Sequence, residues 1–125
     1  MAKLLLLEDE KPLAKIAAKF MTSAGHEVDV VYNGEEGFLK IKGGEPYDLV
    51  ICDLAMPQWD GFKLMDELKA CGIKVKVLIV SAFMGDKRYI ERCNQYEFVL
   101  DYINKPYKRQ VLVDKVAKCL AAPAI

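Results

Sequence analysis

The sequence has few of the features that would indicate histidine catalysis, a disulfide framework or a membrane protein. Its 125 residues include one histidine, His26, which follows Gly25 and is expected to be a turn residue. The four cysteines show no CxxC spacing, which disfavours both zinc binding and disulfide pairing. No apolar run approaches the ~20 residues of a membrane span. We therefore expect a cytoplasmic protein that neither leaves the cell nor crosses a membrane.

The chain also lacks an excess of either charge. Lys and Arg together number 18, as do Asp and Glu, so the net charge is zero and direct binding to nucleic acid is not expected. No internal repeat, low-complexity tract or linker is present. This length and uniformity predict one domain over residues 1–125, with residues 121–125 as a frayed C-terminal tail.

Five short apolar runs alternate with five segments of helical period. This alternation predicts an α/β protein, because parallel strands joined by crossover helices need helices on both faces of the sheet. We expect a flavodoxin-like (βα)5 three-layer sandwich with the parallel strand order 2-1-3-4-5. The predicted strands are Lys3–Leu7, Glu27–Val31, Asp48–Cys52, Val75–Val80 and Leu100–Ile103.

Proline, glycine and capping residues set the predicted helix ends. The first helix is expected to begin near Lys11-Pro12 and to stop at Gly25. A helix around Lys87–Tyr96 is the least regular of the five. All four cysteines are expected to be buried thiols. The apolar residues predicted to form one buried stripe on the first helix are Leu13, Ile16, Ala17, Phe20 and Ala24.

Acidic residues follow two of the predicted strands. Glu8 and Asp9 end the first strand and Asp53 ends the third, and these strands are neighbours at the topological switch point of the expected sheet. Three carboxylates that meet there would repel one another without a cation. A site of oxygen ligands alone suits Mg²⁺. The same cluster would repel an anionic ligand.

The other strand ends supply groups that suit phosphoryl chemistry. Asp53 can attack phosphorus to form an acyl phosphate, while the hydroxyl of Ser81 and the ammonium of Lys105 can bind the phosphoryl oxygens. Taken alone, Asp53 would read equally well as a loop or capping aspartate. Asp60 is expected to be the N-cap of a helix, and Glu10 to favour a helix dipole, so neither is assigned to the site.

Four motifs occur in order over almost the whole chain: Leu-Glu-Asp-Glu, Asp-Leu-Ala-Met-Pro-x-x-Asp-Gly, Val-Ser-Ala and Asp-Tyr-Ile-Asn-Lys-Pro. With these motifs the sequence resembles the receiver domain of two-component response regulators, the family of the stand-alone chemotaxis regulator. The resemblance implies phosphotransfer from a sensor histidine kinase, or a histidine phosphotransfer domain, to Asp53. It also implies Mg²⁺ held by Glu8, Asp9, Asp53 and the backbone carbonyl of Ala55.

The same resemblance implies how the signal leaves the site. Ser81 would be the switch hydroxyl and Tyr102 the aromatic residue whose rotamer follows it. The output face would comprise the fourth helix, fifth strand and fifth helix, and this face would also serve any dimer. Family members often hold the bond that matches Lys105-Pro106 in the cis form.

The function expected from this resemblance is a signalling module that catalyses only its own aspartyl phosphorylation and dephosphorylation. It would act in trans on a downstream effector protein. A flavodoxin-like binder of a nucleotide or flavin is the alternative, although no Gly-rich phosphate loop follows the first strand. A non-phosphorylated scaffold and a fragment of a longer regulator also stay open.

The sequence departs from the family pattern before the fifth strand. Receiver domains usually carry a small Gly-Ala pair there, and this chain has Phe98 and Val99 instead. Without glycine the preceding helix cannot use the usual left-handed C-cap, so its end is expected to run longer or to turn differently.

Overall fold

The computed structural model describes residues 2–125, which form five strands and five helices in strict alternation. The helices follow the strands in the order that the sequence pattern predicts. In chain order the elements are β1 (Lys3–Leu7), α1 (Lys11–Ser23), β2 (Glu27–Val31), α2 (Gly34–Lys42), β3 (Leu49–Cys52), α3 (Gly61–Ala70), β4 (Val77–Ser81), α4 (Lys87–Cys93), β5 (Val99–Asn104) and α5 (Arg109–Ala121).

All described strand pairs are parallel, and the sheet order is β2-β1-β3-β4-β5. This confirms the predicted flavodoxin-like α/β sandwich. The central strands β3 and β4 are buried along their whole length, as their continuous apolar sequences require for strands covered on both faces. The carboxyl ends of all five strands therefore meet at one edge of the sheet.

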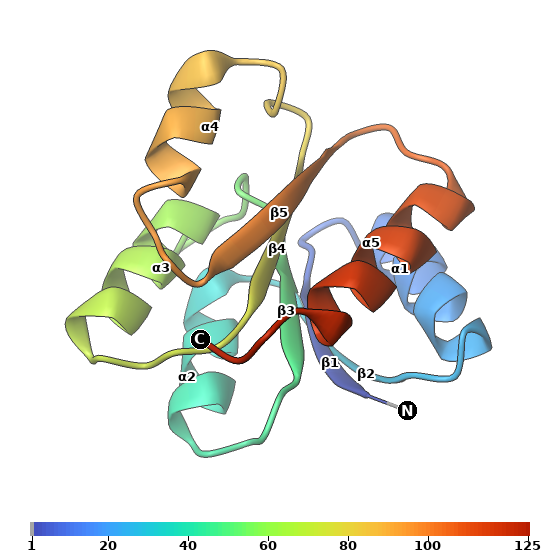
Figure 1. Ribbon diagram of the computed structural model, residues 1–125, viewed down its shortest axis with the longest axis horizontal. Coiled ribbons are helices and arrows are strands. Elements are labelled where there is room, and N and C mark those ends of the chain that lie inside the picture. The colour runs from blue at the N-terminus through green and yellow to red at the C-terminus, as the bar shows by residue number, and fades with distance from the viewer. Residues whose placement is uncertain (1) are drawn as a thin grey trace.

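Helices cover both faces of the sheet (Figure 1), with α1 and α5 on one side and α2, α3 and α4 on the other. Alternate residues of each strand supply the two cores. Leu5 and Leu7 of β1 face the three-helix side, whereas Leu4 and Leu6 face α1 and α5. Each half of the sandwich thus has its own apolar core, and the sheet is held rigidly between them.

The predicted helix signals are confirmed at two ends. The Asp60 side chain accepts a hydrogen bond from the Lys63 amide at 2.8 Å and caps α3. Gly25 adopts a φ of 96° immediately after the C-cap of α1, a conformation that glycine takes without steric cost.

Several predicted bounds shift by a few residues. Strand β3 begins at Leu49 rather than Asp48, because the Asp48 carboxylate accepts the Lys3 amide at 2.8 Å. Strand β4 begins two residues later than predicted, at Val77, and includes Ser81. Strand β5 gains one residue at each end of the predicted range.

The buried stripe predicted for α1 is confirmed at Ala17 but is wrong for Leu13, Ile16 and Ala24. The residues that face the core are Ala14, Ala17 and Met21, whereas Leu13 and Ile16 are 41% and 49% exposed. Both sets have helical spacing, so periodicity alone does not choose between them. Small alanines allow α1 to lie close to the sheet, and the larger side chains are left at the surface, with Phe20 half-buried and Ala24 exposed.

Of the two outcomes expected for the end of α4, a longer helix is wrong, whereas a turn without the left-handed cap is found. It ends at Cys93, three residues before Tyr96, and its C-cap Asn94 keeps a right-handed φ of −69°. Phe98 is buried and its ring stacks on Tyr96. Burial of these two rings draws the chain into β5 in place of a glycine cap, and the β4–β5 register shifts at this point.

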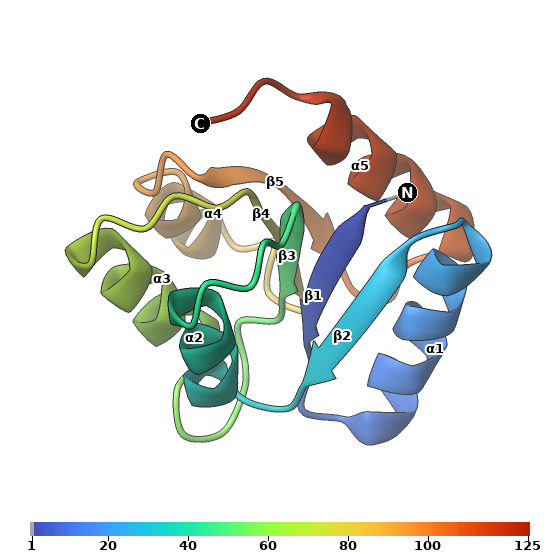
Figure 2. The ribbon, with the colours of Figure 1, turned by 90° about the horizontal axis from the view of Figure 1, so that it is seen from below.

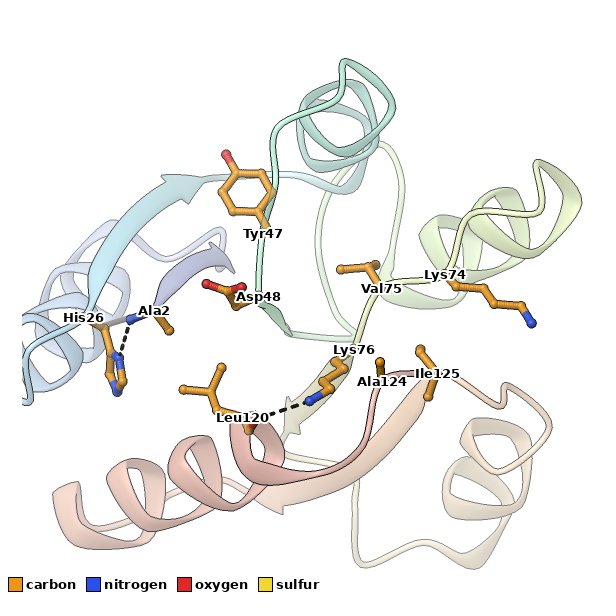
Figure 3. A pocket seen from close by; sticks show the side chains of 10 residues that line it. All are labelled: Ala2, His26, Tyr47, Asp48, Lys74, Val75, Lys76, Leu120, Ala124 and Ile125. Atoms are coloured by element: carbon orange, nitrogen blue, oxygen red, sulfur yellow. Dashed lines mark hydrogen bonds between the residues drawn. The ribbon is translucent and has the colours of Figure 1, made fainter.

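Three of the four cysteines are buried, but Cys71 at the end of α3 is exposed, so the prediction of four buried thiols was wrong there. A cavity of about 590 Å³ lies at the amino-terminal edge of the sheet, where Ala2, Asp48 and Lys76 are among its lining residues (Figure 3). In it Lys76 donates to the carbonyls of Cys119 and Leu120 and so satisfies the last turn of α5.

Within residues 2–125, we find no helix with the length and apolar character needed to cross a membrane.

Candidate functional site

The predicted acidic residues lie together at the carboxyl edge of the sheet. Strands β1 and β3 are neighbours in register, so Leu7 pairs with Cys52 and the residues that follow them, Glu8 and Asp53, emerge side by side. Glu8, Asp9 and Asp53 each offer a carboxylate oxygen within 4.8 Å of the others. Glu8 and Asp53 are buried, and Asp9 is half-buried at the mouth of the cluster.

Lys105 reaches this cluster from the loop after β5. Its Nζ donates to Asp53 Oδ2 at 2.8 Å and to Glu8 Oε1 at 2.5 Å. The Lys105-Pro106 bond is cis, in agreement with the family resemblance. The ammonium therefore bridges two buried carboxylates that come from different strands.

The protonation equilibria reflect this crowding. Burial raises the pKa of the Glu8 carboxyl above its ordinary value, and the hydrogen bond from Lys105 offsets only part of that effect. Burial alone would lower the pKa of the Lys105 ammonium, but its hydrogen bonds to Asp53 and Glu8 outweigh burial and raise the pKa. Lys105 thus stays charged at neutral pH.

The donor set fits a divalent cation. When ionised, three carboxylates beside one ammonium leave two negative charges uncompensated, and every candidate ligand atom is an oxygen. Oxygen donors in a partly open site match the preference of Mg²⁺. Burial is the main cause of the raised pKa of Glu8, and the neighbouring Asp53 carboxylate raises it further.

Ala55 contacts the cluster through its backbone amide, and Ser81 lies at the carboxyl end of β4, the strand beside β3. Ser81 ends β4 with no exposed surface, and its Oγ accepts a hydrogen bond from the Phe83 amide at 3.2 Å. The Ala55 amide donates to Asp53 Oδ1 at 3.1 Å, which leaves Oδ2 to Lys105. Both oxygens of Asp53 are therefore held by donors in this state.

Tyr102 lies away from the carboxylates, in the middle of β5. It pairs with Ile79 of β4 and is half-buried, and its ring packs against the core on the α4 side of the sheet. The Lys105 amide donates to the Ser81 carbonyl at 2.9 Å. This bond and the β4–β5 pairing connect Ser81, Lys105 and Tyr102 through two neighbouring strands.

An apolar groove of about 450 Å³ adjoins the cluster, and the sequence prediction missed it. Glu8 and Lys105 are among the residues that line it, so the groove adjoins the carboxylate cluster. The signal for it was the surplus of apolar residues on α1, more than one buried stripe needs. Its outer residues are Leu13, Ile16, Phe20, Ala82, Pro106 and Tyr107.

Comparisons with known proteins agree with this geometry. The family model described as "Response regulator receiver domain" matches residues 4–117. The probable C4-dicarboxylate response regulator DctR of Bacillus subtilis is 41% identical over 108 residues, which cover 85% of this chain and 46% of DctR. The chain spans about half the length, or less, of the curated relatives that it matches.

Solved structures show the same fold. A Francisella response-regulator receiver domain superimposes with a TM-score of 0.87 at 27% identity, covering 96% of this chain and 97% of that one. The receiver domain of a Pseudomonas aeruginosa sensor histidine kinase, solved with magnesium in its active-site cleft, gives a TM-score of 0.83 at 25% identity, covering 97% and 98%. A flavodoxin-like small-molecule binder is therefore not favoured.

Proposed function

This chain belongs to the response-regulator receiver family, and from that premise we propose that it accepts a phosphoryl group on Asp53 with the aid of Mg²⁺. The observation that supports the proposal most directly is the meeting of Glu8, Asp9 and Asp53 around a bridging Lys105. Mg²⁺ would be held by these three carboxylates and the backbone carbonyl of Ala55. When bound, it supplies positive charge to the transferring phosphoryl oxygens.

The residues of the chain have separate parts in this chemistry. A carboxylate oxygen of Asp53 forms the new bond to phosphorus while the bond from phosphorus to the donor's imidazole nitrogen breaks. The electron pair of that bond stays on the imidazole, which takes up a proton. Lys105 and Ser81 then donate to the phosphoryl oxygens, since both are held at the edge where Asp53 emerges.

The phosphodonor would be a sensor histidine kinase or a histidine phosphotransfer domain that docks on the groove beside α1. Ile16 and Leu13 present apolar surface there, and Glu8 and Lys105 join the groove to the carboxylates. A protein that packs on these side chains can bring a phosphohistidine to Asp53. The chain itself would catalyse only its own phosphorylation and dephosphorylation.

The signal would leave through α4, β5 and α5. Movement of Ser81 toward the phosphoryl group must break its bond with the Phe83 amide, and Tyr102 on the adjoining strand would follow. A downstream protein in the cytoplasm would read the changed face, in trans and without direct contact of this domain with nucleic acid. A dimer through the same face is an alternative use of it.

The test is to treat the protein with acetyl phosphate and Mg²⁺. The wild type is expected to gain the mass of one phosphoryl group, and its amide spectrum should change on addition of beryllofluoride. Asp53→Asn removes the attacking carboxylate and should show neither response. An Asp53→Asn variant that gains a phosphoryl group as fast as the wild type would overturn the assignment.

A further inference from the structure

The segment from the end of β2 to the start of α2 contacts both loops that carry the proposed metal ligands. These loops are residues 8–10, after β1, and residues 53–60, after β3. The Val31 carbonyl accepts the Glu8 amide at 3.1 Å, and the Gly34 amide donates to the Trp59 carbonyl at 3.0 Å. Figure 2 shows the β3–α3 loop beside the first turn of α2. None of the residues in this segment is a candidate ligand.

The contact with the β3–α3 loop is close at Gly34. A Cβ at this position would overlap the carbonyl oxygen of Trp59 and would lie 2.8 Å from the Trp59 Cβ. The first of these atoms belongs to the backbone and the second to the root of the side chain, so neither can move aside as the tip of a flexible side chain could. Any larger residue at position 34 must push the loop away from α2.

The Trp59 side chain strengthens the same contact. Its ring packs on Phe38 of α2 with centroids 5.2 Å apart, and the Lys63 ammonium lies 5.2 Å above the indole ring. Gln58, immediately before it, has a φ of 65°, which is rare for a residue with a side chain. We infer that the packing of Trp59 on α2, rather than the intrinsic backbone preference of Gln58, sets the conformation of the loop.

The two ends of this loop are tied together just beyond β3. The Gly61 amide donates to the Leu54 carbonyl at 2.9 Å, and the Ala55 amide donates to Asp53. Ala55 thus lies on a short loop that is fixed at its base by Gly61 and at its far side by Gly34. A displacement of Trp59 is therefore expected to displace Ala55 as well.

We propose that the contact of Gly34 with Trp59 is a positioning clamp that sets the β3–α3 loop at the distance from Glu8 and Asp9 that Mg²⁺ requires. The inference rests on the proposed function, because it concerns the same metal site. Gly34 and Trp59 would act through the loop and touch neither metal nor phosphoryl group. Loss of partners that orient metal ligands lowers metal affinity by about 10- to 100-fold in other proteins.

The experiment measures Mg²⁺ affinity by titration of amide chemical shifts in the wild type, Gly34→Ala and Gly37→Ala. Gly37 is the matched control, because it lies in the same helix and an added Cβ there meets the Leu7 side chain in the core instead of the loop. Gly34→Ala should raise the Mg²⁺ dissociation constant by about tenfold. Gly37→Ala should leave it within about twofold, although both variants lower the urea midpoint.

A second variant covers the case in which Gly34→Ala does not fold. Trp59 is only partly buried, so Trp59→Ala should fold and should weaken Mg²⁺ binding in the same direction. Equal affinity in the wild type and in the folded Gly34 and Trp59 variants would overturn the clamp while leaving the proposed function intact. Equal weakening in Gly37→Ala would also overturn it, since general destabilisation would then suffice. A wild type that binds no Mg²⁺ would overturn both proposals.

Discussion

Substitution of Lys105 tests how much its positive charge stabilises the buried carboxylates, independently of any phosphorylation. Its ammonium contacts Glu8 and Asp53, whose side chains are only 7% and 10% exposed. Lys105→Met would leave these carboxylates without a cation, so we expect a loss of about 2 kcal/mol of unfolding free energy in Mg²⁺-free buffer. Urea unfolding with and without Mg²⁺ measures this, and excess Mg²⁺ should restore part of the loss.

The same experiment needs a charge control on the surface. Lys74 forms an exposed ion pair with Glu97, so Lys74→Met should change stability by less than about 0.5 kcal/mol and should not respond to Mg²⁺. If Lys105→Met were as stable as the wild type without Mg²⁺, the two carboxylates would not depend on the ammonium, and the electrostatic account of the pocket would be wrong.

The positions of the individual site residues could be predicted from the sequence only because the ends of the strands could be predicted. Glu8, Asp53 and Lys105 each follow an apolar strand, and a parallel sheet gathers such positions at one edge. The direction of the Lys105 ammonium toward both acids, and the contact between Gly34 and Trp59, could not be predicted in this way. They depend on loop conformations that no periodic pattern encodes.

At the scale of elements, α1 shows where periodicity is insufficient. Two apolar stripes share this helix, and the choice between them depends on how closely its backbone can approach β1 and β2. Ala14 and Ala17 permit a close approach that Leu13 and Ile16 would prevent. That packing leaves an apolar surface next to the proposed phosphorylation site, where a partner protein could bind.

A charged residue on this surface should impair a protein donor but not a small one. The experiment uses a histidine kinase that phosphorylates the wild type. Ile16→Glu is expected to lower the rate of phosphotransfer from this kinase about tenfold, because docking would bury the new carboxylate. The rate with acetyl phosphate should be unchanged. Radiolabelled phosphotransfer measures both rates.

The matched control is Leu39→Glu, which changes an apolar residue that is 60% exposed on α2, on the other face of the sheet. Its transfer rate from the kinase should equal that of the wild type. Equal slowing in the two variants, or slowing with acetyl phosphate as well, would remove the groove from the proposed docking surface.

The junction between α4 and β5 makes a separate prediction about alkaline stability. The Tyr96 hydroxyl donates to the Asp66 carboxylate of α3, and burial together with this bond raises the pKa of Tyr96 to about 12. The folded state therefore keeps a proton that the unfolded state releases near pH 10. This contribution to stability is complete below pH 10 and is lost as the pH rises from 10 to 12.

Tyr96→Phe removes that titration. Between pH 9 and pH 11 the wild type should lose about 1 kcal/mol more unfolding free energy than the variant, as measured by urea unfolding at each pH. Lysine side chains also titrate in this pH range, but their contribution is the same in both proteins and cancels in the difference. Parallel losses in the two proteins would show that the phenol of Tyr96 keeps its ordinary pKa in the fold.

For the whole molecule, the fold class and strand order followed from the sequence because alternation of buried strands and amphipathic helices leaves few other arrangements. The end of α4 was less predictable. Phe98 and Tyr96 compete with helix continuation by packing into the core, an interaction between the start of β5 and α3 that only the assembled molecule contains. Consequently the surface around α4 differs from one built on a glycine cap.

The final prediction concerns how this assembled sheet carries a local event to its far surface. Ser81 is bonded to the Phe83 amide on one side, and its carbonyl accepts the Lys105 amide on the other, so it joins the β4–α4 loop to β5. Ser81→Ala removes the hydroxyl that would bind the phosphoryl group but leaves Asp53 and the carboxylate cluster in place. With beryllofluoride and Mg²⁺, amide shifts near Asp53 should persist in this variant.

Shifts at Tyr102 and along α4 should become smaller than in the wild type, because the strand that carries Tyr102 is then no longer drawn by the hydroxyl. Residue-specific amide spectra of the two proteins, each with and without the phosphoryl mimic, measure both effects in one sample. Full Tyr102 shifts in Ser81→Ala would mean that the sheet transmits the charge change by another route, through Lys105 alone. Loss of the shifts near Asp53 would instead mean that the mimic does not bind at all without the Ser81 hydroxyl, and the test of transmission would count against the prediction.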